Sequence, residues 1–157
     1  MSSTIEQRLA ELGIELPAAA KSVANYVPVV ESGNLILTSG QLPLAEGKLV
    51  ATGLVGRDLD VATGVSAARQ CALNVLAQTK GVLGSLDRVA RIVKITVFVA
   101  SASDFTEQHL VANGASDLLV AAFGERGRHA RSAVGVAALP MNAPVEIETV
   151  IEITQEQ

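Results

Sequence analysis

The stretch "RVARIVKITVFVA", residues 88–100, decides the class of the fold. It is rich in β-branched residues and alternates enough between apolar and polar side chains to predict a central strand of a sheet. Apolar residues at helical spacing precede it from Val61 to about Leu83, and a second helical pattern follows from Val111 to Phe123. A long strand between two helices predicts an α+β domain in which helices cover a sheet.

Shorter strands are predicted on the N-terminal side of this unit. The segments "NYVPVV" and "NLILTSGQLP" flank "ESGN", a turn signal that indicates a hairpin. Another turn leads to a short third strand at residues 49–52. Before the hairpin, the spacing of apolar residues from Thr4 to Leu12 predicts a short amphipathic helix.

Two more strands are predicted after the second helix. The run from Ser132 to Leu139 is small and apolar and is interpreted as a buried strand. The turn "LPMNAP" leads to "VEIETVIEIT", residues 145–154, whose strict alternation predicts a final strand. The expected order is therefore β-β-β-α-β-α-β-β, a mixed six-stranded sheet with two main helices on one face and a short N-terminal helix.

The composition bounds the organisation of the chain. Its 157 residues suit a single domain over 1–157, with an N-terminal helical extension over about 1–20. Hydrophobic residues make up 49% and charged residues 18%, while aromatic residues reach only 3%. This apolar excess must be buried inside the domain or between subunits, so we expect an obligate oligomer.

Several classes of function are disfavoured by charge and patterning. The net charge of −4 and the absence of basic runs argue against nucleic-acid binding, and no uninterrupted apolar stretch is long enough to span a membrane. The single cysteine, Cys71, and the lack of a signal peptide favour a reducing cytoplasm. His109 and His129 are far apart and lack metal-ligand spacing, so no metal site is expected.

Arg131 is the first candidate for a functional residue. It stands in "GRHARSAVGVAALP", residues 127–140, directly before the predicted strand. A guanidinium keeps its charge and must find acceptors, so Arg131 either binds a carboxylate or phosphate of a ligand or forms a structural ion pair with Glu146 or Asp117. His129 lies close to it in sequence and is either a loop histidine or part of the same site.

Glu146 and Glu148 are the second candidate. They share one face of the last strand. If the apolar face packs on the helices, both carboxylates point away from the helix layer, where they either face solvent or line a cleft between subunits. If the last two strands formed a hairpin, it could bring Arg131 near Glu146, and the carboxylate could hold a water or exchange a proton.

The segment "LTSGQLP" is the third candidate. Gly40 either relieves crowding at a bulge or lets a ligand approach the backbone, where its amide and the Ser39 hydroxyl could bind a carboxylate. Tyr26 is either a pocket wall or an ordinary strand aromatic.

At these residues the sequence resembles a known family. The segments "NYVPVVESGNLILTSGQLP", "RVARIVKITVFVASASDF" and "HARSAVGVAALPMNAPVEIETV" together are similar to the Rid family of reactive intermediate deaminases, also called YjgF-like or endoribonuclease L-PSP. The resemblance extends over about residues 24–154. It implies a chorismate-mutase-like fold, a homotrimer with three clefts between subunits, and hydrolysis of reactive enamines and imines to keto acids and ammonia. It implies no metal and no cofactor.

The resemblance also implies roles for individual residues. Arg131 matches the arginine that binds the substrate carboxylate, and Glu146 matches the glutamate that positions water or handles protons. Tyr26 matches a tyrosine of the cleft, and Ser39 and Gly40 match the loop that contacts the ligand.

The sequence departs from the deaminase branch in the segment "GERGRHARS", in the N-terminal helix and at two places that bear on the cleft. Ala133 stands where that branch usually has cysteine, and it would contact ligand chiefly through its backbone. The stretch 105–123 is longer than in that branch, so Asn113 is only a candidate for the usual asparagine of the cleft. These departures indicate a divergent subgroup.

The sequence therefore leads to one main hypothesis and two alternatives. The main hypothesis is a cytoplasmic homotrimer that hydrolyses a small carboxylate-bearing imine or enamine. The first alternative is a non-catalytic trimer that binds a small carboxylate metabolite. The second, the ribonuclease of the family label, is disfavoured because the chain is acidic and has one tyrosine and no tryptophan for base stacking.

Overall fold

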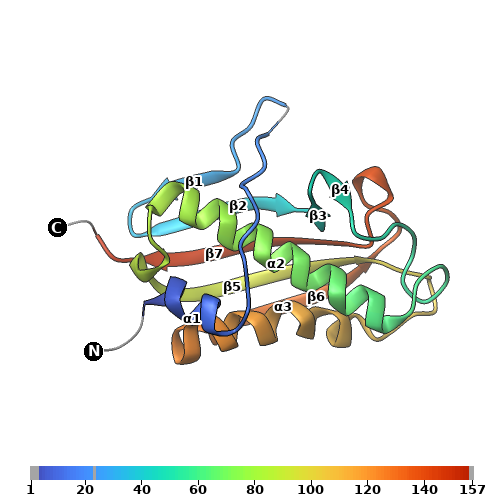
Figure 1. The fold of residues 1–157 in the computed structure, drawn as a ribbon. Coiled ribbons are helices and arrows are strands. Elements are labelled where there is room, and N and C mark those ends of the chain that lie inside the picture. Colours follow the sequence, from blue (N-terminus) through green and yellow to red (C-terminus); the bar gives the residue numbers. More distant parts are fainter. Residues whose placement is uncertain (1–3, 23, 156–157) are drawn as a thin grey trace.

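A five-stranded mixed sheet forms the centre of the protein (Figure 1). The computed structural model describes residues 4–22 and 24–155. The strand order across the sheet is β1-β2-β7-β5-β6, with β5 and β6 parallel and the other neighbours antiparallel. The strands of this sheet are β1 (Val29–Ser32), β2 (Leu35–Gln41), β5 (Val89–Ala100), β6 (Ala130–Val136) and β7 (Val145–Ile153).

Two helices lie side by side on one face of this sheet, α2 (Val61–Leu83) and α3 (Gln108–Phe123) (Figure 1). The Asp60 side chain caps α2 by accepting a hydrogen bond from the Thr63 amide. The helix ends at Gly84, whose φ of 82° is easily adopted only without a side chain. The sequence placed both helices correctly, although α3 begins three residues earlier than predicted.

A third helix, α1 (Ile5–Glu11), packs near the end of α3 and confirms the predicted N-terminal helix. Thr4 and Gln7 form a capping box, in which each side chain accepts a hydrogen bond from the backbone amide of the other residue. The first three residues of the predicted extension, 1–20, lie outside the described residues.

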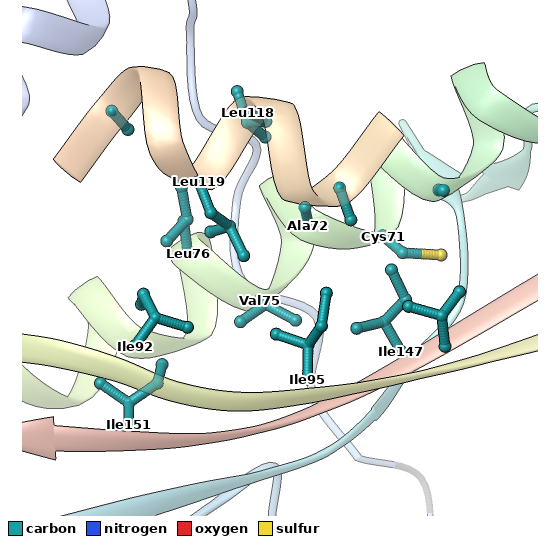
Figure 2. Packing of buried hydrophobic residues seen from close by; sticks show 14 of the residues in the cluster. Cys71, Ala72, Val75, Leu76, Ile92, Ile95, Leu118, Leu119, Ile147 and Ile151 are labelled. Carbon is teal, nitrogen blue, oxygen red and sulfur yellow. The ribbon is translucent and has the colours of Figure 1, made fainter. Parts of the chain in front are cut away.

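The hydrophobic core fills the space between the two long helices and the sheet (Figure 2). Branched side chains of β5 and β7 point toward aliphatic side chains of the helices, and nearly all of them are fully buried. The labelled residues of this layer include Val75, Leu76, Ile92, Ile95, Leu118, Leu119, Ile147 and Ile151. The apolar face of β7 therefore packs on the helices, as its alternation predicted.

Gly114 allows α2 and α3 to pack closely. A Cβ built at this position would overlap the carbonyl oxygen of Val65, so no larger residue fits without moving the helices. The distance between the helices fixes where α3 presents its side chains beside the sheet.

The predicted third strand does not join the main sheet, so the expected six strands are reduced to five. Instead, β3 (Leu44–Ala45) and β4 (Lys48–Leu49) form a separate two-stranded sheet. Its first strand is tied to α2, because the Asn74 side chain donates to the carbonyl oxygens of Leu42 (2.8 Å) and Leu44 (2.9 Å). Contacts with a helix thus replace pairing with the sheet, which short-range turn signals could not reveal.

The predicted buried strand from Ser132 to Leu139 is also corrected. The observed strand β6 begins at Ala130 and ends at Val136, so Arg131 lies within it. Among the described residues β6 is the edge strand of the sheet and pairs with β5 alone, so its residues are half-buried or exposed in a single chain. The small, apolar residues of this segment predicted a buried strand, but within one chain the strand is not fully buried.

Candidate functional site

Arg131 reaches from the edge strand β6 to helix α3. Its register partner on β5 is the buried Ile95, which places the Arg131 side chain on the helix-covered face. Its Nη1 donates hydrogen bonds to Asn113 Oδ1 (2.9 Å) and Ser116 Oγ (3.1 Å). Its Nη2 donates to the His109 carbonyl oxygen (3.3 Å).

The three acceptors around Arg131 are all neutral. Among the residues that the structure describes, neither Glu146 nor Asp117 comes within ion-pair distance of its guanidinium. The structural ion pair considered from the sequence is therefore absent there. The guanidinium is oriented by Asn113 and Ser116 but keeps an uncompensated charge, a state suited to binding an external carboxylate.

His129 is linked to Arg131 through Ser116. The Nε2 atom of His129 lies 2.8 Å from Ser116 Oγ, and its Nδ1 lies 2.6 Å from the Gly127 carbonyl oxygen. Burial lowers the pKa of His129, the charge of Arg131 lowers it further, and the Gly127 carbonyl opposes both. The sequence left the role of His129 open, and the structure places it beside the arginine.

Ser116 was missed by the sequence analysis. A signal for it existed, because Ser116 follows Asn113 by three residues and so shares its face of α3. Ser116 borders an open hollow of about 580 Å³. Its lining residues are Ser116, Asp117, Val120, Ala121, Arg128, His129 and Arg131.

Ala133 lies on the same face of β6 as Arg131, two residues further along, where it packs against the core. We call the group of Asn113, Ser116, His129, Arg131 and Ala133 the arginine half-site. Each of these residues comes from α3, from β6 or from the turn before β6.

Glu146 lies on the other face of the sheet, over Gly40. A Cβ at Gly40 would stand 2.7 Å from both Cδ and Oε2 of Glu146, so the glycine leaves the space that the carboxyl group occupies. The register between β2 and β7 shifts between Thr38 and Gln41, so Gly40 does sit at a bulge. Burial raises the pKa of Glu146, and the nearby charge of Glu148 raises it further.

Ser39 precedes Gly40 in β2 and is bonded to the segment that follows Tyr26. The Ser39 amide donates to the Pro28 carbonyl (2.8 Å), and its hydroxyl donates to the Val27 carbonyl (2.7 Å). These bonds hold the segment that carries Tyr26 beside β2, and the Tyr26 side chain is 56% exposed. We call Tyr26, Ser39, Gly40 and Glu146 the glutamate half-site.

The two half-sites do not meet within one chain. Strand β5 lies between β6 and β7, and Arg131 and Glu146 pair with different residues of it, Ile95 and Phe98, on opposite faces. The expected hairpin between the last two strands is therefore wrong. Because β6 runs parallel to β5 and β7 antiparallel to it, the turn before β7 crosses the end of β5.

A larger hollow of about 1010 Å³ lies at the other end of β6. It contains Arg57, whose charge is paired with Asp58 at 3.1 Å, so it offers a weaker anion anchor than Arg131. Across residues 4–22 and 24–155, no three metal-ligating side chains converge. In the same residues, no helix combines the length and apolarity needed to cross a membrane.

Comparisons with known proteins agree with this architecture. A family model described as "YjgF/chorismate_mutase-like, putative endoribonuclease" matches residues 6–153. The chorismate-mutase-like α+β fold expected from the resemblance is thereby confirmed.

Two curated relatives match most of the chain. Protein TCP17 of Trypanosoma cruzi is 52% identical over 97% of this chain and 96% of that protein. The 2-iminobutanoate/2-iminopropanoate deaminase of Escherichia coli K12 is 34% identical over 84% of this chain and 90% of that enzyme.

Two solved structures share the fold over nearly the whole chain. Protein Atu1372 of Agrobacterium tumefaciens, of unknown function, superposes with a TM-score of 0.90 at 56% identity, covering 96% of this chain and 92% of that one. TdcF of Escherichia coli, solved with bound serine, superposes with a TM-score of 0.63 at 28% identity, covering 89% and 97%.

Proposed function

The chain belongs to the Rid family of YjgF-like proteins, and from this premise we propose that it hydrolyses small imines or enamines that carry a carboxylate, giving a keto acid and ammonia. The observation that carries the proposal is the state of Arg131. Its guanidinium is held by three neutral acceptors and has no carboxylate partner among the described residues. A relative named as an imine deaminase supports the same chemistry.

In this proposal, Arg131 binds the substrate carboxylate. Both hydrogens of Nη1 are engaged by Asn113 and Ser116, while Nε and one hydrogen of Nη2 remain for the ligand. A carboxylate held by such charge-assisted bonds is fixed in orientation as well as in position. Ala133 would contribute backbone contacts further along β6.

Glu146 is proposed to handle water and protons. Its raised pKa brings the carboxyl group closer to neutral pH, where it can both accept and donate a proton. Water adds to the imine carbon while Glu146 accepts its proton. Glu146 returns this proton to the nitrogen, which gives a carbinolamine. The carbinolamine hydroxyl then gives its proton to Glu146, which passes it to the nitrogen as the carbon–nitrogen bond breaks, so that ammonia is released and the keto acid remains. Tyr26, Ser39 and the Gly40 amide would line the same cleft.

The mechanism requires a second copy of the chain. Because Arg131 and Glu146 lie on opposite faces of one sheet, a complete cleft forms only when the arginine half-site of one subunit meets the glutamate half-site of another. We propose a homotrimer with three such clefts. The exposed apolar residues on the face of the sheet opposite the helices support burial between subunits, among them Val30 (50%), Leu37 (42%) and Val134 (42%).

The test follows ammonia release from 2-iminopropanoate and related imines. The wild type should accelerate hydrolysis, and Arg131→Ala should abolish the acceleration without changing the oligomeric state. Arg57→Ala, which removes an exposed arginine outside both half-sites, is the matched control and should stay active. If keto acids bind through Arg131 but no imine is hydrolysed faster, the chain is instead a non-catalytic carboxylate-binding protein.

A further inference from the structure

A chain of hydrogen bonds runs from Arg131 through Ser116 and His129 to the Gly127 carbonyl, and its direction can be deduced. A carbonyl oxygen only accepts, so the Nδ1 atom of His129, 2.6 Å away, must carry a hydrogen. In the neutral ring Nε2 then has a lone pair and accepts from the Ser116 hydroxyl at 2.8 Å. The Ser116 oxygen in turn accepts from Arg131 Nη1 at 3.1 Å. Only one tautomer of neutral His129 satisfies every bond.

The packing of the turn before β6 fixes the position of the Gly127 carbonyl. Gly127 is buried, and a Cβ at its position would overlap the Leu119 carbonyl oxygen and come within 3.1 Å of Phe123 Cβ. The absence of a side chain therefore lets the turn Gly124–Gly127 press against the end of α3. This contact fixes the Gly127 carbonyl relative to the helix that carries Ser116.

The surroundings of His129 favour its neutral form. The ring is half-buried, and it lies between two hollows whose charged residues include more cations than anions. The charged groups that line the hollows around it are Arg91, Asp117, Arg128, Arg131 and Glu152. A second positive charge beside Arg131 would be repelled, which agrees with the lowered pKa of His129.

We infer that Ser116 and His129 are positioning residues that hold the Arg131 guanidinium in one orientation for a ligand carboxylate. The inference rests on the proposed function insofar as a carboxylate is the ligand. Neither residue touches the reacting atoms. Their loss should therefore weaken carboxylate binding and raise KM, while kcat for bound substrate changes little.

Paired variants separate positioning from simple structural support. Ser116→Ala and His129→Leu each remove one link, and each should weaken binding of 2-oxobutanoate about tenfold by calorimetry. Ser116→Thr keeps the hydroxyl, and His129→Gln offers an amide oxygen that can accept from Ser116, so both should bind nearly as tightly as wild type. The double variant Ser116→Ala/His129→Leu should bind no worse than either single variant, because the links act in series.

Unchanged affinity in both Ser116→Ala and His129→Leu, with binding lost in Arg131→Ala, would overturn the inference. If wild type binds no carboxylate, the proposed function fails instead. The ¹⁵N NMR spectrum of labelled histidine then tests whether the hydrogen bonds run from Arg131 through Ser116 and His129 as deduced. We expect His129 protonated on Nδ1 alone at neutral pH, with an Nε2 signal that shifts in Ser116→Ala. The other tautomer, or a doubly protonated ring, would refute this arrangement of hydrogen bonds.

Discussion

Arg131 and Glu146 lie on opposite faces of one sheet, on strands separated by β5. Each is prepared for chemistry in its own surroundings. Arg131 is oriented by neutral acceptors, and Glu146 is half-buried over a glycine with its pKa raised. Because the two side chains do not meet within a single chain, the proposed site needs both half-sites, each from a different copy of the chain.

Arg131→Lys should bind carboxylate poorly even though it keeps the positive charge. An ammonium lacks the planar fork and cannot donate to Asn113, Ser116 and a ligand in the same geometry. We expect kcat/KM to fall by about 10- to 100-fold, in line with the loss of charged hydrogen bonds. Steady-state kinetics would measure the change. Full activity of Arg131→Lys would show that charge alone is sufficient.

Gly40→Ala should displace Glu146. The added Cβ would stand 2.7 Å from the Glu146 carboxyl carbon, so the side chain must move or the strands must shift. We expect a loss of about 1–3 kcal/mol in the free energy of unfolding, with reduced turnover. The double variant Gly40→Ala/Glu146→Ala should recover most of the stability, because the overlapping group is gone. Equal losses in the single and double variants would mean that the backbone, rather than Glu146, requires the glycine.

Replacing each of two helical glycines by alanine should change the free energy of unfolding in opposite directions. At Gly114, a Cβ overlaps the Val65 carbonyl, so Gly114→Ala should push α2 and α3 apart and cost about 1–3 kcal/mol. At Gly81, inside α2, the nearest atom to an added Cβ is Ala19 Cβ at 3.9 Å, so Gly81→Ala should add about 0.5–1 kcal/mol of stability. Denaturant unfolding compares both with wild type. A stabilised Gly114→Ala would contradict the close helix contact.

Stability should fall in mild acid because of His129. Its pKa is lowered from its ordinary value of 6.5 by burial and by Arg131, so the unfolded chain binds the proton more readily than the folded protein. The neutral ring therefore contributes to the stability of the folded protein. This contribution is fully present above about pH 6.5 and is lost as the pH falls through the lower pKa of the folded state. Measured between pH 8 and 5, the free energy of unfolding should depend less steeply on pH for His129→Gln than for wild type. Identical slopes would exclude this role.

The sequence predicted the parts of this molecule that local patterns control. The helical spacing of 61–83, the alternation of β7 and the division of Glu146 and Ile147 between its two faces are all observed. The pairing partners of the strands were harder to predict from the sequence, because the position of β5 between β6 and β7 depends on contacts between distant segments. The same reason explains why residues 49–52 did not join the sheet.

The candidate site was predictable where chemistry is concentrated in one residue. Arg131 stood out by its charge before an apolar run, and Asn113, only a candidate from the sequence, lies 2.9 Å from it. The spacing could have placed Ser116 beside Asn113, but the hydrogen bond between Ser116 and His129 could not be found in this way. Their relationship depends on how a four-residue turn packs against the end of α3, which residue spacing does not encode.

The central claim is that the cleft is shared between subunits, and mixing two inactive variants tests it most directly. Arg131→Ala keeps an intact glutamate half-site, and Glu146→Gln keeps an intact arginine half-site. Coexpressed in equal amounts, they should form mixed oligomers in which about a quarter of the clefts combine two intact halves, and imine hydrolysis should return to about a quarter of the wild-type rate. Mixed oligomers with no recovered activity would contradict the account, because they would place both residues of a working site on the same chain.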